Sequence, residues 1–191
     1  MASILNVDQI NNAAGTSGIA LDASTGKASF PNSVTIPNGA TMPAGSVVQV
    51  VSVSSTGLLQ TTSQSFADLP GMTASITPTS ASSKILITYV NHLYVAQTAT
   101  TAWQAACTNL LRDSTLIREE GTSGYYTGHN SDSSNDRFMD YQAIVYYDSP
   151  ATTSSITYKL QGAAKISDNA IFFNDPGYAR GGTLTLMEIA Q

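Results

Sequence analysis

KILITYVNHLYV, residues 84–95, is the stretch of sequence that decides the fold. Most of its residues are β-branched, aromatic or leucine, and apolar residues recur at every second position through much of its length. Alternation with a period of two places side chains on the two faces of a pleated strand. Apolar side chains also occupy part of the second face. The stretch therefore predicts a long β-strand.

Working outward from this strand, residues 46–191 contain further short runs of Val, Ile, Thr and Tyr separated by turn residues. The segment 103–117 is ambiguous, because Ala105, Ala106, Leu110 and Leu111 also recur at a near-helical spacing. We interpret it as a long strand that leads into a hairpin at residues 112–114. The expected strands are 47–53, 63–69, 72–77, 84–95, 103–111, 115–118, 138–147, 155–161, 171–174 and 183–189, with a turn at Pro70-Gly71. Short strands at this spacing predict an all-β fold, an antiparallel β-sandwich of jelly-roll type.

Composition excludes several classes of protein. Of the 191 residues only 11% are charged, against about 25% in an average domain, and the net charge is −5. Eight scattered Lys and Arg residues make no basic stripe, so we expect no nucleic acid as a partner. We expect no membrane insertion either, because no run of 18 apolar residues occurs. The N-terminus does not resemble a secretory signal, and the single cysteine excludes an intrachain disulfide, which together indicate synthesis in a reducing cytoplasm.

Composition shifts near residue 46. Residues 1–45 are rich in Asn, Gly, Ala, Ser and Pro and contain only short strand-like pairs of apolar residues. Such a segment has too few large apolar residues to bury a core alone. It is either a flexible leader or an extended arm that folds against another chain, and we favour the arm because exposed Ile, Val and Leu side chains are costly in water. The residues expected to bind a partner are Leu5, Val7, Ile10, Ile19, Leu21, Phe30, Val34 and Ile36. The predicted domains are thus an arm at 1–45 and a sandwich head at 46–191.

No pattern in the chain indicates catalysis, a cofactor or a metal. His92 lies inside the predicted strand 84–95, where a structural role is the ordinary interpretation, and Cys107 among small apolar residues indicates a buried thiol. The oxygen-rich segment HNSDSSND, residues 129–136, suits calcium in ligand type but equally suits a solvated turn. Glu119, Glu120, Asp140 and Asp148 are available as carboxylates, but their spacing nominates no acid–base pair. We therefore expect a protein that is not an enzyme.

The segment 121–135 is the strongest candidate for recognition. It carries Tyr125, Tyr126 and His129 among Gly, Ser and Asn, a combination typical of adaptable binding loops. Such a loop would suit a sugar, through ring stacking and amide contacts. The alternative is an ordinary hairpin loop whose tyrosines pack locally.

The opening SILNVDQINNAAGTSGIALD, residues 3–22, resembles the N-terminus of many bacteriophage virion proteins. The remainder is similar to a β-rich domain at the ends of phage tail fibres and tailspikes. Four stretches carry this similarity: ITPTSASSKILITYV at 76–90, NLLRDSTLI at 109–117, VYYDSPATTSSITYKLQ at 145–161 and TLTLMEIAQ at 183–191. These motifs are structural and contain no catalytic signature. The resemblance implies a homotrimer with a sandwich head and an N-terminal attachment region. Capsid-decorating cement trimers are built on a similar sandwich.

The expected function is therefore that of a capsid cement protein on the virion surface, which binds the major capsid protein through the arm. No shaft of collagen-like, heptad or β-helical repeats precedes the head, which favours cement over a fibre. The alternative is the receptor-binding head of a short tail fibre, located at the tail and recognising a glycan of the host surface.

Overall fold

The computed structural model describes residues 9–11, 17–21, 28–29, 42–96, 105–125, 137–165, 170–178 and 181–191. The chain divides into two compact units, residues 1–41 and residues 42–191. The first contains a three-stranded antiparallel sheet in the order β1-β2-β3, with β1 at Gln9–Asn11, β2 at Ser17–Leu21 and β3 at Ala28–Ser29. Ile10 stands opposite Ile19 in the β1–β2 pair.

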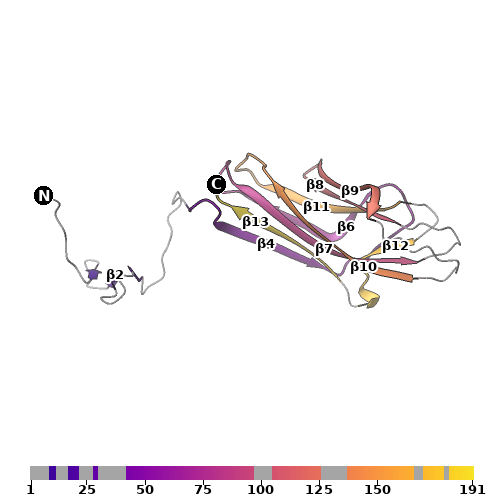
Figure 1. Cartoon of the computed structure of the whole chain (residues 1–191), viewed down its shortest axis with the longest axis horizontal. Helices are drawn as coiled ribbons and strands as arrows, with labels where there is room; N and C mark the ends of the chain where they lie inside the picture. Colours follow the sequence, from indigo (N-terminus) through magenta and orange to yellow (C-terminus); the bar gives the residue numbers. More distant parts are fainter. Residues whose placement is uncertain are drawn as a thin grey trace. The chain divides into compact units, whose positions relative to one another are not determined.

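The second unit is an antiparallel β-sandwich, as predicted, and Figure 1 shows its strands in two layers. Sheet 1 is built around β7 (Lys84–Ala96), the strand expected at 84–95. Along one edge of β7 lies β10 (Arg137–Asp148). Along the other edge two strands follow one another, β13 (Gly182–Ile189) and β12 (Ala170–Phe173). Sheet 1 continues outward with β4 (Val47–Ser55) beside β13 and β5 (Leu59–Thr61) beside β12.

Sheet 2 has the order β6-β11-β8-β9. Its strands are β6 (Ala67–Ile76), β11 (Ile156–Ala164), β8 (Ala106–Arg112) and β9 (Thr115–Tyr125). A short 3-10 helix, Pro176–Tyr178, lies between β12 and β13. No helix in the described part of the chain is both long and apolar enough to cross a membrane.

Alternating inward side chains of the two sheets form one core. In β7 the inward positions Ile85, Ile87 and Tyr89 are almost completely buried, and in β11 so are Tyr158 and Leu160. Each large apolar side chain removed from water stabilises the fold by about 1.5–3 kcal/mol. The alternation of apolar residues in 84–95 thus corresponds to a strand whose inner face is buried along its whole length.

The hairpin expected at residues 112–114 is present, and β8 is a strand, so the near-helical spacing at 105–111 was a coincidence. β8 ends at Arg112, and Asp113 and Ser114 form the turn into β9. Asp113 adopts a positive φ of 52°, and its backbone N–H donates to the Thr157 carbonyl at 2.7 Å. An Asp residue tolerates this left-handed conformation better than most residues do.

The predicted turn at Pro70-Gly71 is wrong, because both residues lie inside the continuous strand β6. The register with β11 places residues 69–72 opposite Leu160 alone, so a β-bulge accommodates the two turn residues. Gly71 takes a positive φ of 73°, and the Pro70 carbonyl accepts a hydrogen bond from the Ser55 hydroxyl. A proline lacks the N–H that a regular ladder needs, and the bulge removes that requirement. The short strand β5 was not predicted.

Candidate interaction surfaces

The strand registers define two ends of the sandwich. At the proximal end the chain joins the sheet: the Gly45 N–H donates to the Ala190 carbonyl at 2.8 Å, and the Ala190 N–H donates to the Ser46 carbonyl at 2.9 Å. Lys84, at the start of β7, is at the same end because it stands opposite Ile189. The distal end holds Ala96, twelve residues farther along β7, which at about 3.3 Å per residue is roughly 40 Å away.

Tyr125 of the candidate recognition segment lies at the distal end. It stands opposite Ala106, the first residue of β8, and closes strand β9. The predicted loop 121–135 therefore starts later than expected, since residues 121–125 continue β9 instead of leaving it. Residues 121–124 stand opposite Cys107 alone, so the Gly-Thr-Ser-Gly segment forms a large bulge. Tyr126 and His129 lie outside the described residues.

Of the predicted arm residues, Ile10, Ile19 and Leu21 fall on strands β1 and β2. The register brings Ile10 and Ile19 together as a cross-strand pair. The other five, Leu5, Val7, Phe30, Val34 and Ile36, lie outside the described residues.

The proximal end contains a buried carboxylate, Glu188 of β13, whose side chain is fully shielded from solvent. Gln49 donates to it at 2.6 Å, and the Thr79 N–H and hydroxyl donate at 2.8 and 2.7 Å. Burial raises the pKa of Glu188, but the hydrogen bonds from Gln49, Ser83 and Thr79 outweigh burial and leave the pKa below its usual value. Glu188 is thus held as a carboxylate and ties the segment after β6 to sheet 1.

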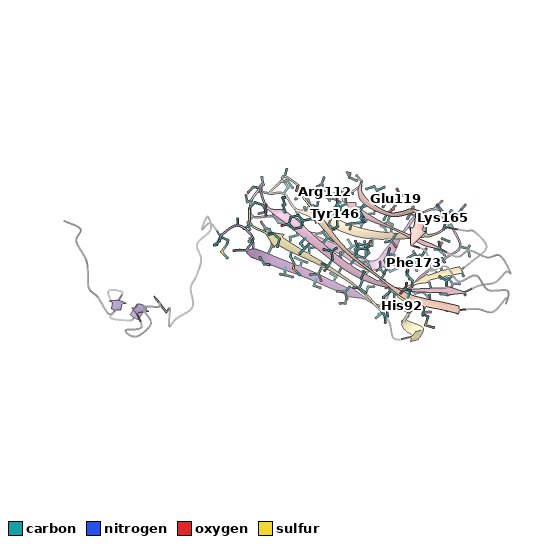
Figure 2. All side chains as sticks on the ribbon, in the orientation of Figure 1. His92, Arg112, Glu119, Tyr146, Lys165 and Phe173 are labelled. Carbon is teal, nitrogen blue, oxygen red and sulfur yellow. The ribbon has the colours of Figure 1, made fainter. Side chains whose placement is uncertain are left out.

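A second polar cluster joins the two sheets at the same end. Arg112 of β8 lies 2.9 Å from the carboxylate of Asp148 on β10, and the Tyr158 hydroxyl of β11 donates to that carboxylate at 2.7 Å. Burial raises the pKa of Tyr158, and its hydrogen bond to Asp148 raises it further, so the phenol stays protonated and remains a donor. Figure 2 shows Arg112 toward one end of the strands and His92 and Lys165 toward the other.

His92 and Cys107 are buried, as predicted for structural residues. The rings of His92 and Tyr141 meet edge to face, with centroids 5.3 Å apart. The backbone N–H of His92 donates to the Asn174 side-chain oxygen at 3.1 Å. Burial raises the pKa of the Cys107 thiol, with a smaller upward contribution from Glu119 that opposes the lowering by Lys165. Neither residue is placed for nucleophilic chemistry.

The four carboxylates considered for catalysis are distributed over both sheets. Glu119 and Glu120 belong to β9, whereas Asp140 and Asp148 belong to β10. Asp148 is engaged by Arg112 and Tyr158, and Asp140 accepts from the Tyr141 N–H at 2.7 Å. Within the described residues no group of three or more His, Cys, Asp or Glu could hold a metal ion, and residues 129–136 lie outside them.

Sequence reasoning missed one surface, the outward side of sheet 1. On β10 the outward residues Tyr141, Val145 and Tyr147 are 47%, 68% and 46% exposed, and Val50 of β4 is 55% exposed. The apolar run VYY at 145–147 indicated such a surface. When both faces of a strand are apolar, however, the sequence does not determine which face packs in the core.

No protein-family model and no curated protein matches the sequence. Among solved structures, the chain is similar to VP2 of infectious bursal disease virus. Derived T=1 particles of the D431N mutant give 10% identity and a TM-score of 0.38 over 84% of this chain and 41% of that chain. The structure of the Gt strain is 15% identical, with a TM-score of 0.40, and the match covers 98% of this chain and 52% of that chain. Dimeric latent PorU from Porphyromonas gingivalis is 13% identical, with a TM-score of 0.31, and the match covers 81% of this chain and 14% of that chain. This chain thus spans about half or less of each match, and likenesses of this size carry no argument about function.

Proposed function

We propose that this chain is a non-enzymatic structural protein of the bacteriophage virion, a trimeric cement protein that binds the capsid through residues 1–45. The N-terminal unit is the observation that carries the proposal. Its sheet has strands of three, five and two residues in a unit of 41 residues. At about 40 residues or fewer, a domain usually needs a disulfide, a metal or a partner chain to be stable. The only cysteine of the chain is Cys107, which lies in the other unit.

A partner surface would supply the burial that this unit needs. Ile10 and Ile19 form a cross-strand pair, and the strands β1 and β3 are the edges of their sheet within the described residues. A sheet edge accepts a further strand from another chain through backbone hydrogen bonds. Binding to the assembled shell, and not to its free subunits, stabilises the shell by mass action. Three arms per trimer would multiply weak contacts through avidity.

The location of the protein on the particle tests the proposal first. Immunogold electron microscopy of intact phage, with an antibody against residues 46–191, is expected to place gold over the whole head. Gold confined to the tail would contradict the cement role and favour the fibre alternative. Particles without gold would overturn the assignment to the virion.

The arm is tested by charge introduced at the paired isoleucines. In co-sedimentation with shells that lack this protein, the full-length variant Ile10→Asp with Ile19→Asp should bind at least about tenfold more weakly, because each buried Ile contributes about 1.5–3 kcal/mol. Leu116→Asp is the matched control, since Leu116 is an exposed residue of β9 on the sandwich. Equal binding by the arm variant and the wild type would disprove the arm mechanism.

The second candidate function is a receptor-binding head, which the position of Tyr125 favours. Tyr125 lies at the distal end, roughly 40 Å along β7 from the point at which the chain joins the sandwich. A head attached through its proximal end would present the distal end outward. Replacing Tyr125 and Tyr126 by Ala should then reduce binding to host cells while the head remains folded. Unchanged cell binding would exclude this loop as the recognition site.

A further inference from the structure

The outer face of sheet 1 combines one continuous apolar row across four strands with further rows in which Val, Ala and Tyr alternate with Ser and Thr. We define this outer face by its outward-pointing residues: Val50, Ser52, Ser54, Leu86, Thr88, Val90, Tyr141, Ala143, Val145, Tyr147, Thr183, Thr185 and Met187. The registers align Tyr147, Leu86, Met187 and Val50 as one apolar row that crosses β10, β7, β13 and β4. Five of these residues, Val50, Val90, Tyr141, Val145 and Tyr147, are exposed large apolar side chains, and such side chains gathered on one face indicate an interaction surface.

Four hydroxyls of the outer face are already paired across β4 and β13, Ser52 with Thr185 and Ser54 with Thr183. The Ser52 hydroxyl lies 2.8 Å from the Thr185 hydroxyl. The Lys84 ammonium, at the margin, lies 5.3 Å from the centroid of the Tyr147 ring. A hydroxyl that keeps its hydrogen bond loses little when a partner excludes water, whereas an orphaned hydroxyl costs about 1–3 kcal/mol. These four hydroxyls can therefore be desolvated at little cost.

The charge pattern indicates what kind of partner fits. None of the thirteen residues of the outer face is acidic or basic, although the chain as a whole carries a net charge of −5. A nucleic acid or an acidic protein would find only the Lys84 ammonium at the margin, which already lies over the Tyr147 ring, and a basic protein would find no acidic residue among the thirteen. A second copy of the same face meets no like-charge repulsion, and around a threefold axis each copy of the face can contact both of its neighbours.

The dimensions agree with an interface between copies. Four strand tracks at about 4.8 Å spacing span roughly 19 Å, and seven residues along each strand span roughly 23 Å. With side-chain relief, such a face presents several hundred Å², which is comparable to the ~800 Å² that each partner buries in a standard interface. The single exposed leucine of sheet 2, Leu116, offers nothing comparable among the described residues.

We propose that copies of this chain pack against one another through the outer face of sheet 1, with Val50, Val145 and Tyr147 in the contact. The number of copies, three, rests on the proposed function. The geometry itself assigns the face and the occupant, a second copy of this chain.

The oligomeric mass of the full-length protein tests the inference. Light scattering after size-exclusion chromatography should give three times 20.0 kDa for the wild type. The variant Val50→Asp with Val145→Asp should weaken association about 100-fold or more and elute as a monomer, because each contact would then bring like charges together. Both side chains are more than half exposed, so the monomer fold tolerates the change, which far-ultraviolet circular dichroism verifies. Leu116→Asp, the control on sheet 2, should keep the wild-type mass.

A trimer that persists in the double variant would overturn the assignment of this face while leaving the proposed trimer intact. A wild-type monomer at about 100 μM that still binds phage shells would overturn the self-association and leave the cement role standing. A trimeric wild type that fails to bind shells would support the face and contradict the proposed function. A stoichiometry of two would support the face and contradict the trimer.

Discussion

Asp148 and Glu188 are the two cross-strand neighbours of Ile85, one on each side of it. Both point into the sandwich, and both are buried. Because paired residues in adjacent strands lie about 5 Å apart, the two acidic residues are separated by about 10 Å across a fully buried isoleucine. Neither carboxylate takes its hydrogen bonds from β7. Glu188 accepts from Gln49 of β4 and from Thr79, and Asp148 accepts from Arg112 of β8 and Tyr158 of β11. The proximal end of the sandwich thus holds two buried acidic side chains, and the residues that donate to them come from both sheets and from the segment after β6.

Replacement of Glu188 should lower the free energy of unfolding at pH 7 and should also reduce the loss of stability at acidic pH. Gln49, Thr79 and Ser83 donate to this carboxylate, so Glu188→Ala leaves several donors without an acceptor and should cost about 3 kcal/mol or more at pH 7. The folded-state pKa lies below the ordinary 4.5, so the carboxylate stabilises the fold fully above pH 4.5 and this contribution disappears as pH falls through the lower folded-state pKa. Urea unfolding at pH 7 and pH 3 measures both effects.

In the same experiment Asp68→Asn provides an exposed control. Lys159 lies 2.9 Å from Asp68, whose side chain is 54% exposed, and such pairs contribute about 0–1 kcal/mol. If Glu188→Ala lost as much stability between pH 7 and pH 3 as the wild type does, Glu188 would not be a source of the acid sensitivity.

Arg112, Asp148 and Tyr158 should behave as one unit. Arg112→Met leaves the Asp148 carboxylate buried with Tyr158 as its remaining donor and should cost about 2–3 kcal/mol, less than a fully buried pair because the Arg112 side chain is 27% exposed. Tyr158→Phe should cost about 1–2 kcal/mol. Because both act on the same carboxylate, a double-mutant cycle in chemical denaturation should show an interaction of at least about 0.5 kcal/mol. Strict additivity would mean that the two contacts are independent.

Much of the sandwich could be predicted because its inward residues alternate. The strands at 84–95, 138–147, 155–161 and 183–189 were all located correctly, within one to three residues at each end. Pro70-Gly71 failed because a turn dipeptide and a β-bulge have the same sequence signature, and only the opposite strand decides between them. In β6 the hydroxyl of Ser55, fifteen residues away, binds the Pro70 carbonyl, and that contact is invisible in the local sequence.

The candidate sites were less predictable than the fold. Tyr125 was identified from its composition, yet its place at the distal end depends on the pairing with Ala106, which sequence does not give. The outer face of sheet 1 was missed because Val145 and Tyr147 alternate with Tyr146 and Ile144, and both sets are apolar. Which set faces the core is decided by the register with β7, where Tyr146 stands opposite the buried Ile87.

The Cys107 thiol should react slowly in the folded protein. It is 5% exposed, and burial raises its pKa, so at pH 8 little of the reactive thiolate forms. A chromogenic disulfide reagent should therefore label the native protein about 100-fold or more slowly than the urea-unfolded chain, through local opening of sheet 2. Labelling at similar rates in both states would show that Cys107 is accessible.

The bulge in β6 can be tested with two glycines of similar backbone conformation. Gly71 and Gly45 have φ values of +73° and +87°, so Ala is strained at either position by about 1–2 kcal/mol. At Gly71 the added Cβ would also lie 2.5 Å from the Ser55 hydroxyl oxygen, whereas at Gly45 it would meet nothing within 4 Å. Gly71→Ala should therefore cost about 1–3 kcal/mol more than Gly45→Ala in thermal or urea unfolding. Equal costs would mean that Ser55 moves aside freely, and its hydrogen bond to the Pro70 carbonyl would then contribute little to holding the bulge.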